Sequence, residues 1–138
     1  MSRFTKIGAN GEQLAADAEG CVAALDTKQG LMFTTIKSEE MTHAQAIKYV
    51  AGLEVAGFKD WRLPTVEELF LLADRSRVKS PAIDTDIFPD CKSDWYWTGT
   101  LYASSPGVYA WCVSFDGGGA GWGYQGFSGF VRACRAGQ

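Results

Sequence analysis

The stretch Gly57–Leu69, GFKDWRLPTVEEL, decides the fold, because it leads an extended segment directly into a capped helix. Thr65 and Glu68 have the spacing of a capping box, in which the threonine hydroxyl and the glutamate carboxylate each accept a hydrogen bond from the other residue's backbone amide. Apolar residues then recur at helical spacing, namely Val66, Leu69, Phe70 and Ala73. The pattern predicts a helix over residues 65–74.

A second capping box precedes this stretch. Thr42 and Gln45 predict a helix over residues 42–56 that ends at Gly57. Its expected inward face consists of apolar residues at helical spacing, which are Ala46, Ile47, Val50 and Leu53. The two predicted helices are therefore neighbours in the sequence.

The rest of the chain is predicted to be strands and loops. Residues 21–36 have the pattern of a β-hairpin with a turn that ends in glycine. Four more strands are expected later, at residues 95–100, 108–115, 121–125 and 130–135. Because the helices are grouped apart from the strands, the order favours an α+β fold. We expect one loop-rich domain over residues 1–138, with residues 1–20 as an N-terminal arm or strand.

Residues 75–92 form a long irregular connection, and long loops in compact domains are usually functional or well packed. Its apolar residues favour packing against the core; they are Ile83, Ile87 and Phe88.

Further motifs stand in a fixed order around the opening stretch. They are Ile83-Asp84 with Phe88-Pro89, Tyr96–Thr100 (YWTGT), Ala110–Phe115 (AWCVSF) and Val131–Arg135 (VRACR). In these residues the chain resembles the bacterial domain family at the C-terminus of the Legionella collagen-like adhesin, over about residues 20–135. Gly30–Phe33 is similar to the family's GL-x-W segment, with Phe in place of Trp. The resemblance implies a C-type-lectin-like fold, two helices packed on short antiparallel strands, related to the formylglycine-generating enzyme fold. It also implies binding rather than catalysis.

The composition makes several classes of function unlikely for this chain. The net charge is −3, and its 13 Lys and Arg residues are mixed among 16 Asp and Glu residues. Without a basic cluster we expect no nucleic-acid partner. No apolar run is long enough to span a membrane. The first ten residues lack the apolar region of a signal peptide, so we expect a cytoplasmic protein or one associated with a phage particle.

The sequence predicts no catalytic site, metal site or cofactor. The four cysteines, Cys21, Cys91, Cys112 and Cys134, lack the paired spacing of a zinc site. We expect them to be free thiols, with a disulfide between Cys112 and Cys134 as the alternative. Asp84, Asp86 and Asp90 are not expected to bind calcium, because the sugar-binding calcium motifs of C-type lectins are absent. His43 is expected on an exposed turn, without a catalytic role.

The candidate binding site lies in the glycine-rich C-terminal segment. Residues 116–129 contain seven glycines, and Trp122 and Tyr124 would share one face of a strand. Rings with a polar tip between small residues suit recognition. The residues predicted to bind a ligand are Tyr102, Ser104, Ser105, Tyr109, Trp122, Tyr124, Gln125 and Phe127. The alternatives are that these rings cover the core and that residues 101–109 form a solvated loop.

The other tryptophans and the arginines in the motifs are assigned structural roles. Trp61, Trp97 and Trp111 are predicted to be core residues. An arginine in an apolar setting needs a carboxylate partner. Arg62, Arg132 and Arg135 are therefore expected to pair with acidic residues such as Asp60, Asp84 or Glu68.

Two functions follow from the sequence. The leading one is a non-enzymatic recognition module that binds a glycan or a protein surface, of an adhesin or diversified type. Residues 116–129 carry one Asp and no Lys or Arg, so a protein or a neutral sugar suits them better than a polyanion. The alternative is an assembly subunit of the phage or prophage tail-tip type, which would use the same surface to form a homo-oligomer such as a trimer.

Overall fold

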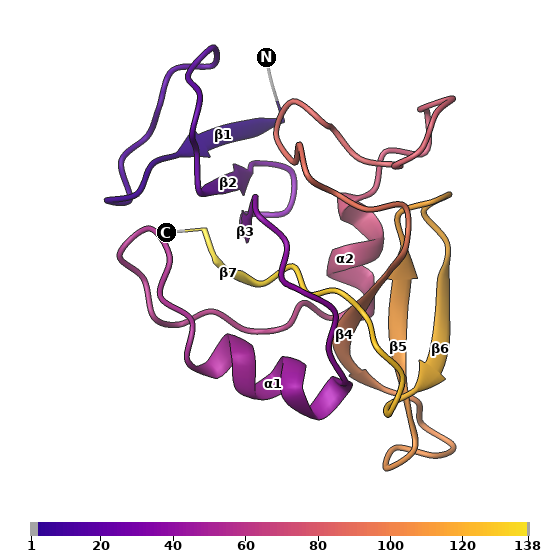
Figure 1. Cartoon of the computed structure of the whole chain (residues 1–138). Helices are drawn as coiled ribbons and strands as arrows, with labels where there is room; N and C mark the ends of the chain where they lie inside the picture. The colour runs from indigo at the N-terminus through magenta and orange to yellow at the C-terminus, as the bar shows by residue number, and fades with distance from the viewer. Residues whose placement is uncertain (1–2, 138) are drawn as a thin grey trace.

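The computed structural model describes residues 3–137 and has an α+β fold with two antiparallel sheets and two helices (Figure 1). The first sheet has the order β1-β2-β3-β7, with β1 (Phe4–Ile7), β2 (Ala23–Asp26), β3 (Leu31–Thr34) and β7 (Cys134–Ala136). The second sheet has the order β4-β5-β6, with β4 (Trp95–Leu101), β5 (Tyr109–Ser114) and β6 (Ala120–Tyr124). The helices are α1 (His43–Ala51) and α2 (Val66–Leu72).

Both helices begin at the predicted capping boxes. The Thr65 amide donates to Glu68 Oε1 at 2.8 Å, and the Glu68 amide donates to Thr65 Oγ1 at 3.2 Å. Thr42 and Gln45 form the same reciprocal pair. Each box satisfies helix amides that have no intrahelical partner, and a cap of this kind is worth about 1 kcal/mol.

The end of α1 differs from the prediction. The helix stops at Gly52, ahead of the expected Gly57, and the chain then turns through Ala56 (φ 57°) and Gly57 (φ 80°). The left-handed conformation at Ala56 and Gly57 also prevents the helix from resuming there, and Ala56 is the one residue other than glycine with a positive φ among residues 3–137. The predicted inward face was wrong at Ile47, which is 51% exposed.

His43, expected on an exposed turn, is buried instead. Its Nε2 lies 2.9 Å from the carbonyl oxygen of Thr98, so Nε2 carries the proton that is donated. The ring also packs edge to face on Trp97, with centroids 5.1 Å apart. His43 therefore joins α1 to β4.

The last predicted strand is divided between the two sheets. At Phe130 the chain lies along the edge of β4, and the Trp97 amide donates to the Phe130 carbonyl at 2.9 Å. Only Cys134–Ala136 form a strand, β7, and it pairs with β3 rather than with the later strands. The segment between them thus joins the two sheets.

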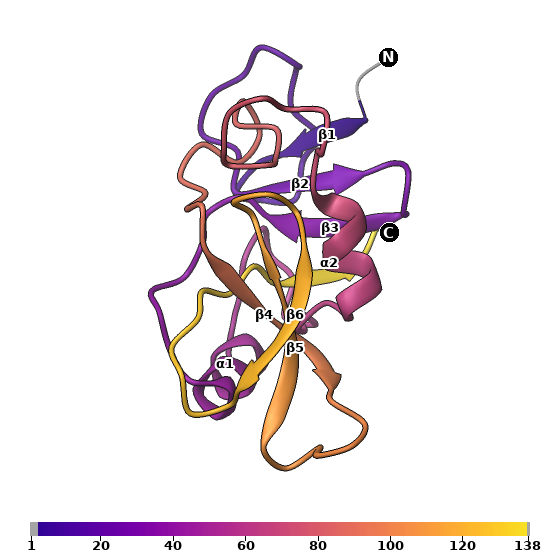
Figure 2. The same ribbon diagram turned by 90° about the vertical axis from the view of Figure 1, so that its right-hand side faces the viewer.

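The core has two clusters of buried residues. The larger lies where α2 meets both sheets, and it includes the side chains by which the long 75–92 connection packs as predicted: Ile83, Ile87 and Phe88. The smaller includes Trp61 and Trp97, together with Ala46 and Val50 of α1. On one face of the second sheet, α2 packs against parts of β4 and β5. β6 lies farther from α2 than these two strands do (Figure 2).

Candidate functional site

The pairing of β5 with β6 brings several rings onto one face of the second sheet. Trp111 stands opposite Trp122, and Tyr109 stands opposite Tyr124. Residues two apart in a strand point to the same side, so these four rings share a face. Tyr102, from the loop after β4, stacks on Trp122 with ring centroids 4.6 Å apart and planes 20° apart. We call these five residues the aromatic face.

The rings of the aromatic face support one another. Trp111 meets Trp122 edge to face at 5.4 Å, and Tyr102 lies 5.9 Å from Trp111 and 6.1 Å from Tyr109. Offset and edge-to-face pairs of this kind are worth about 0.5–1.5 kcal/mol each beyond the area they bury. These contacts hold Trp122 in a fixed arrangement although its ring is 52% exposed. Tyr124, which is 49% exposed, packs on Phe127 instead.

The polar atoms of the aromatic face are unused. The hydroxyls of Tyr102, Tyr109 and Tyr124 and the indole nitrogens of Trp111 and Trp122 make no hydrogen bond within residues 3–137. The buried rings differ. Trp97 Nε1 donates to the Met41 carbonyl at 2.9 Å, and Trp61 Nε1 donates to the carbonyls of Val55 and Phe58. Buried Tyr and Trp usually find such partners, so the free atoms mark a surface that faces solvent.

The glycines of β6 belong to the opposite face of the sheet. A Cβ atom at Gly121 would lie 3.2 Å from the Trp95 ring, and one at Gly123 would lie 3.8 Å from Cys112 Sγ. The alternation of glycine with Trp122 and Tyr124 therefore lets Trp95 pack closely on one side while large rings occupy the other.

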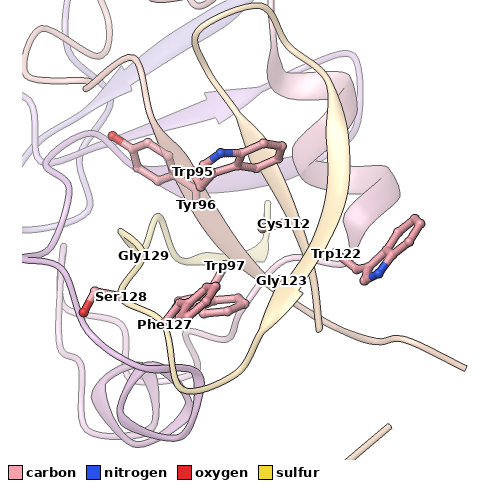
Figure 3. A pocket seen from close by; sticks show the side chains of 9 residues that line it. All are labelled: Trp95, Tyr96, Trp97, Cys112, Trp122, Gly123, Phe127, Ser128 and Gly129. Atoms are coloured by element: carbon pink, nitrogen blue, oxygen red, sulfur yellow. The ribbon is translucent and has the colours of Figure 1, made fainter. Parts of the chain in front are cut away.

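Beside these glycines is a pocket of about 270 Å³, which we call the Trp95 pocket (Figure 3). It is lined by Trp95, Tyr96, Trp97, Cys112, Trp122, Gly123, Phe127, Ser128 and Gly129. The Trp122 ring points away from Trp95, Trp97 and Phe127 (Figure 3). The pocket and the aromatic face therefore lie on opposite sides of the sheet, and no charged side chain lines the pocket.

The other predicted binding residues, Gln125, Phe127, Ser104 and Ser105, lie outside the aromatic face. Gln125 supports the loop after β4, because its Nε2 donates to the carbonyls of Pro106 at 3.0 Å and Tyr109 at 3.2 Å. Phe127 is 66% exposed, packs edge to face on Tyr124, and lines the Trp95 pocket. Ser104 is exposed at the tip of the loop, whereas the Ser105 carbonyl accepts the turn hydrogen bonds of that loop.

One core prediction was wrong. Trp61 and Trp97 are buried as expected, but Trp111 is only half-buried and belongs to the aromatic face. A motif position suggested a core residue, whereas the pairing partner of Trp111 is the exposed Trp122. Trp95 is the ring that sequence reasoning missed. Its spacing of two from Trp97 was a usable signal, because it puts both rings on one side of β4.

Two of the three motif arginines pair as expected. Arg62 makes a two-pronged contact with Glu68, at 2.8 and 2.9 Å, and the hydrogen bonds from Arg62 lower the pKa of this carboxyl. Arg135 Nε donates to Asp60 at 2.6 Å. Arg132 pairs with no carboxylate of residues 3–137: its fully buried guanidinium donates Nη1 to the Thr34 carbonyl and lies over the Phe88 ring. All three arginines therefore make contacts within the fold.

The buried thiols are poor nucleophiles. Burial raises the pKa of Cys112 to about 11 and that of Cys134 to about 12. Both therefore stay protonated near neutral pH, where the thiolate would be the reactive form. All four cysteines are free in the structure, and Cys112 and Cys134 lie in different sheets.

The described residues form neither a metal cluster nor a membrane-spanning helix. Residues 3–137 contain no group of three or more His, Cys, Asp or Glu side chains placed to hold a metal ion. Neither helix in that part of the chain has the length and apolar character needed to cross a membrane.

The comparisons with known proteins agree with the order of the motifs. No curated protein matches the chain. The family model described as the Lcl C-terminal domain matches residues 22–135, which include both helices and all strands except β1 and the last residue of β7. The chain therefore belongs to the Lcl C-terminal domain family, the C-terminal domains of Legionella collagen-like proteins and their relatives.

Proposed function

We propose that the protein is a non-enzymatic recognition module that binds a neutral glycan or a protein surface through its aromatic face. The observation that carries the proposal is a set of four mutually packed rings, Tyr102, Tyr109, Trp111 and Trp122, with Tyr124 beside them on the same face. The polar atoms of all five side chains have no partner within residues 3–137. Membership in a family of collagen-like adhesin domains is consistent with a binding module.

The physical argument rests on preorganisation. Tyr and Trp offer a large contact area at a small cost in side-chain entropy, and stacking already restricts the rings here. A ligand that covers Trp122 would remove its exposed half from water and could accept its free N–H. A central aromatic residue of this kind can contribute 2 kcal/mol or more to binding.

Charge supports an uncharged ligand. Residues 117–129, which include β6, contain no Lys, Arg, Asp or Glu. None of the five rings has a cation stacked over it within the described residues. The apolar C–H face of a neutral sugar, or an apolar side chain of a partner protein, suits this surface better than a sulfated chain.

The proposal includes the C-type-lectin-like form of the α+β fold. It is supported by the strands near the two ends of the described chain, β1 and β7, which belong to the same sheet, and by the second sheet that projects the aromatic face. In such an arrangement the first sheet forms the base and the second sheet presents the ligand surface.

The experiment is to apply the purified protein to a glycan array and to a panel of immobilised host proteins. The variants are Trp122→Ala and Tyr124→Ala, with Tyr49→Ala as the matched control, since Tyr49 is a 38% exposed tyrosine on α1. We expect a reproducible uncharged ligand whose affinity falls at least about thirtyfold in Trp122→Ala, the equivalent of about 2 kcal/mol. Tyr49→Ala should bind as the wild type does.

The arms of this experiment separate the alternatives. Glycan spots alone would identify a lectin, and protein spots alone would identify a protein receptor. If ligands are retained with unchanged affinity by a folded Trp122→Ala variant, the aromatic face is not the binding surface. Strict dependence on sulfated glycans would contradict the uncharged ligand.

A further inference from the structure

The outer edge of β6 is unpaired within the described chain. Two backbone hydrogen bonds show which amides and carbonyls of this segment point toward β5. The Ser114 amide donates to the Gly119 carbonyl, and the Gln125 amide donates to the Val108 carbonyl. In an antiparallel pair, residues alternate between facing the neighbour and facing away. Gly121 and Gly123 therefore bond to β5, and the outward groups belong to Ala120, Trp122 and Tyr124.

No other segment of the described chain covers these outward groups. Within residues 3–137, they have no backbone partner apart from the Tyr124 carbonyl, which accepts the Phe127 amide at 2.9 Å. β6 is the outermost strand at the right of Figure 1, and no other strand or helix lies in front of it in Figure 2. The edge faces solvent.

The other sheet edges in the described chain are covered. The Leu14 amide donates to the Lys6 carbonyl on β1, Cys134 of β7 exchanges two bonds with Arg62, and the Phe130 amide donates to the Trp95 carbonyl on β4. These segments occupy the outer sides of β1, β7 and β4. β6 is thus the exception within residues 3–137.

The β6 edge also lacks the usual protection against pairing. Exposed edges normally carry lysine, proline, a bulge or an inward charge that prevents another strand from adding to them. Residues 117–129 contain no charged residue and no proline, and β6 pairs with β5 in continuous register. An uncharged, regular edge of this kind is suited to a partner strand.

We propose that this partner is β6 of a second copy of the protein. A two-fold axis beside Trp122 would place Trp122 next to its copy, and the strand is nearly symmetric about that residue because Gly121 and Gly123 flank it. The same axis sets the small Ala120 opposite the large Tyr124 of the second copy. Self-complementarity of this kind is what a two-fold interface requires.

The pairing satisfies the free backbone groups. Trp122 exchanges N–H···O=C bonds with Trp122 of the second copy, and the Tyr124 amide donates to the Ala120 carbonyl across the axis. On the Trp95 side, glycine meets glycine, so no side chain obstructs the approach. The two sheets then form one continuous sheet, and the two aromatic faces lie side by side with their outer surfaces still open to a ligand.

The first test is sedimentation velocity from about 1 μM to about 1 mM, a range that covers dissociation constants typical of weak to moderate dimers. The full chain should pass from monomer to dimer with concentration. Amide hydrogen exchange on the same samples should show the Trp122 and Tyr124 amides becoming protected as the dimer forms. An assembly through the ring faces would leave those amides unprotected, and that result would overturn the proposal.

Edge variants complete the test. Ala120→Lys places a charge on the edge, and Ala120→Pro removes an outward N–H; neither change removes a bond to β5. Each should raise the dimer dissociation constant at least about tenfold. Ala103→Lys, at an exposed loop position, adds the same charge away from the edge and should dimerise normally.

A protein that stays monomeric throughout the range, a trimer, or a dimer unaffected by Ala120→Lys would each overturn the edge pairing. None of these outcomes bears on the aromatic face as a ligand site. Ala120→Lys keeps every ring of that face, so loss of dimerisation and loss of ligand binding are measured separately.

Discussion

The first sheet and the second sheet use their polar groups in different ways. In the first, Asp26 is fully buried and accepts hydrogen bonds from Arg3, Gln29 and the Lys28 amide, and both outer strands are covered by other segments. In the second, the rings of the aromatic face and the edge of β6 leave donors and acceptors unpaired within residues 3–137. The comparison teaches that the first sheet uses its polar groups within the fold, whereas the second sheet leaves polar groups at the surface.

The largest expected loss of stability comes from removing a buried ring of the second sheet, Trp97 of β4. Trp97 is 3% exposed, and its Nε1 donates to the Met41 carbonyl. Trp97→Ala should lower the free energy of unfolding by about 3–5 kcal/mol, as for other buried tryptophans. Urea unfolding followed by circular dichroism measures this, with an unchanged slope to show that the transition remains two-state. If Trp97→Ala lowered the free energy of unfolding by less than about 1 kcal/mol, Trp97 would not differ in stability contribution from the rings of the aromatic face.

The next effect concerns the paired carboxylate of the first sheet. Burial raises the pKa of Asp26, but the hydrogen bonds from Arg3 and Gln29 outweigh it, so the pKa is lowered below its ordinary value of 3.8. Asp26→Asn should cost about 1.5–3 kcal/mol at pH 7, the range for hydrogen bonds to charged groups.

The pH dependence has a definite sign. A carboxyl with a lowered pKa stabilises the fold above its unfolded pKa of about 3.9, and this contribution is lost as the pH falls through the folded value. The difference in unfolding free energy between wild type and Asp26→Asn should therefore be constant from pH 7 to about pH 5 and shrink below about pH 4. A constant difference down to pH 2 would show that the Arg3–Asp26 charge pair is not its source.

Two glycines of the C-terminal segment, Gly129 and Gly119, differ in how closely other atoms approach them. A Cβ atom at Gly129 would lie 3.0 Å from Trp97 Nε1, whereas one at Gly119 would meet nothing within 4 Å. Gly129→Ala should cost about 1–3 kcal/mol through overpacking, and Gly119→Ala should change stability by no more than about 0.5 kcal/mol. Thermal unfolding of the two variants measures the contrast. Equal melting temperatures would mean that Trp97 can move aside.

Local sequence predicted the parts of the fold that depend on local bonds. The capping boxes at Thr42 and Thr65 fixed both helix starts, because each bond joins residues three apart. The hairpin of β2 and β3 was predicted for the same reason. The end of α1 was missed because the prediction took Gly57 as the end of the helix, whereas the helix is already capped at Gly52.

The parts that were missed depend on long-range contacts. β7 pairs with β3, about a hundred residues away in the sequence, and no local pattern specifies that partner. Trp111 was assigned to the core because it stands at a motif position. Only the position of α2, which covers Val113 but not Trp111, separates the buried end of that strand from the open one. The rings Tyr102, Trp122 and Tyr124 were predicted as a group, whereas the stacking of Tyr102 on Trp122 required the structure.

The most direct test of the aromatic face is a ring substitution that should cost much less stability than Trp97→Ala. Trp122→Ala should lower the free energy of unfolding by about 1–2 kcal/mol, since the ring is half exposed and loses its contacts with Tyr102 and Trp111. The measurement is the urea unfolding of Trp122→Ala beside that of Trp97→Ala, at the same pH and protein concentration. A small loss for Trp122 and a large loss for Trp97 is the predicted result. A loss of 3 kcal/mol or more for Trp122, an amount typical of buried aromatics, would show that the ring belongs to the core and would contradict the recognition surface.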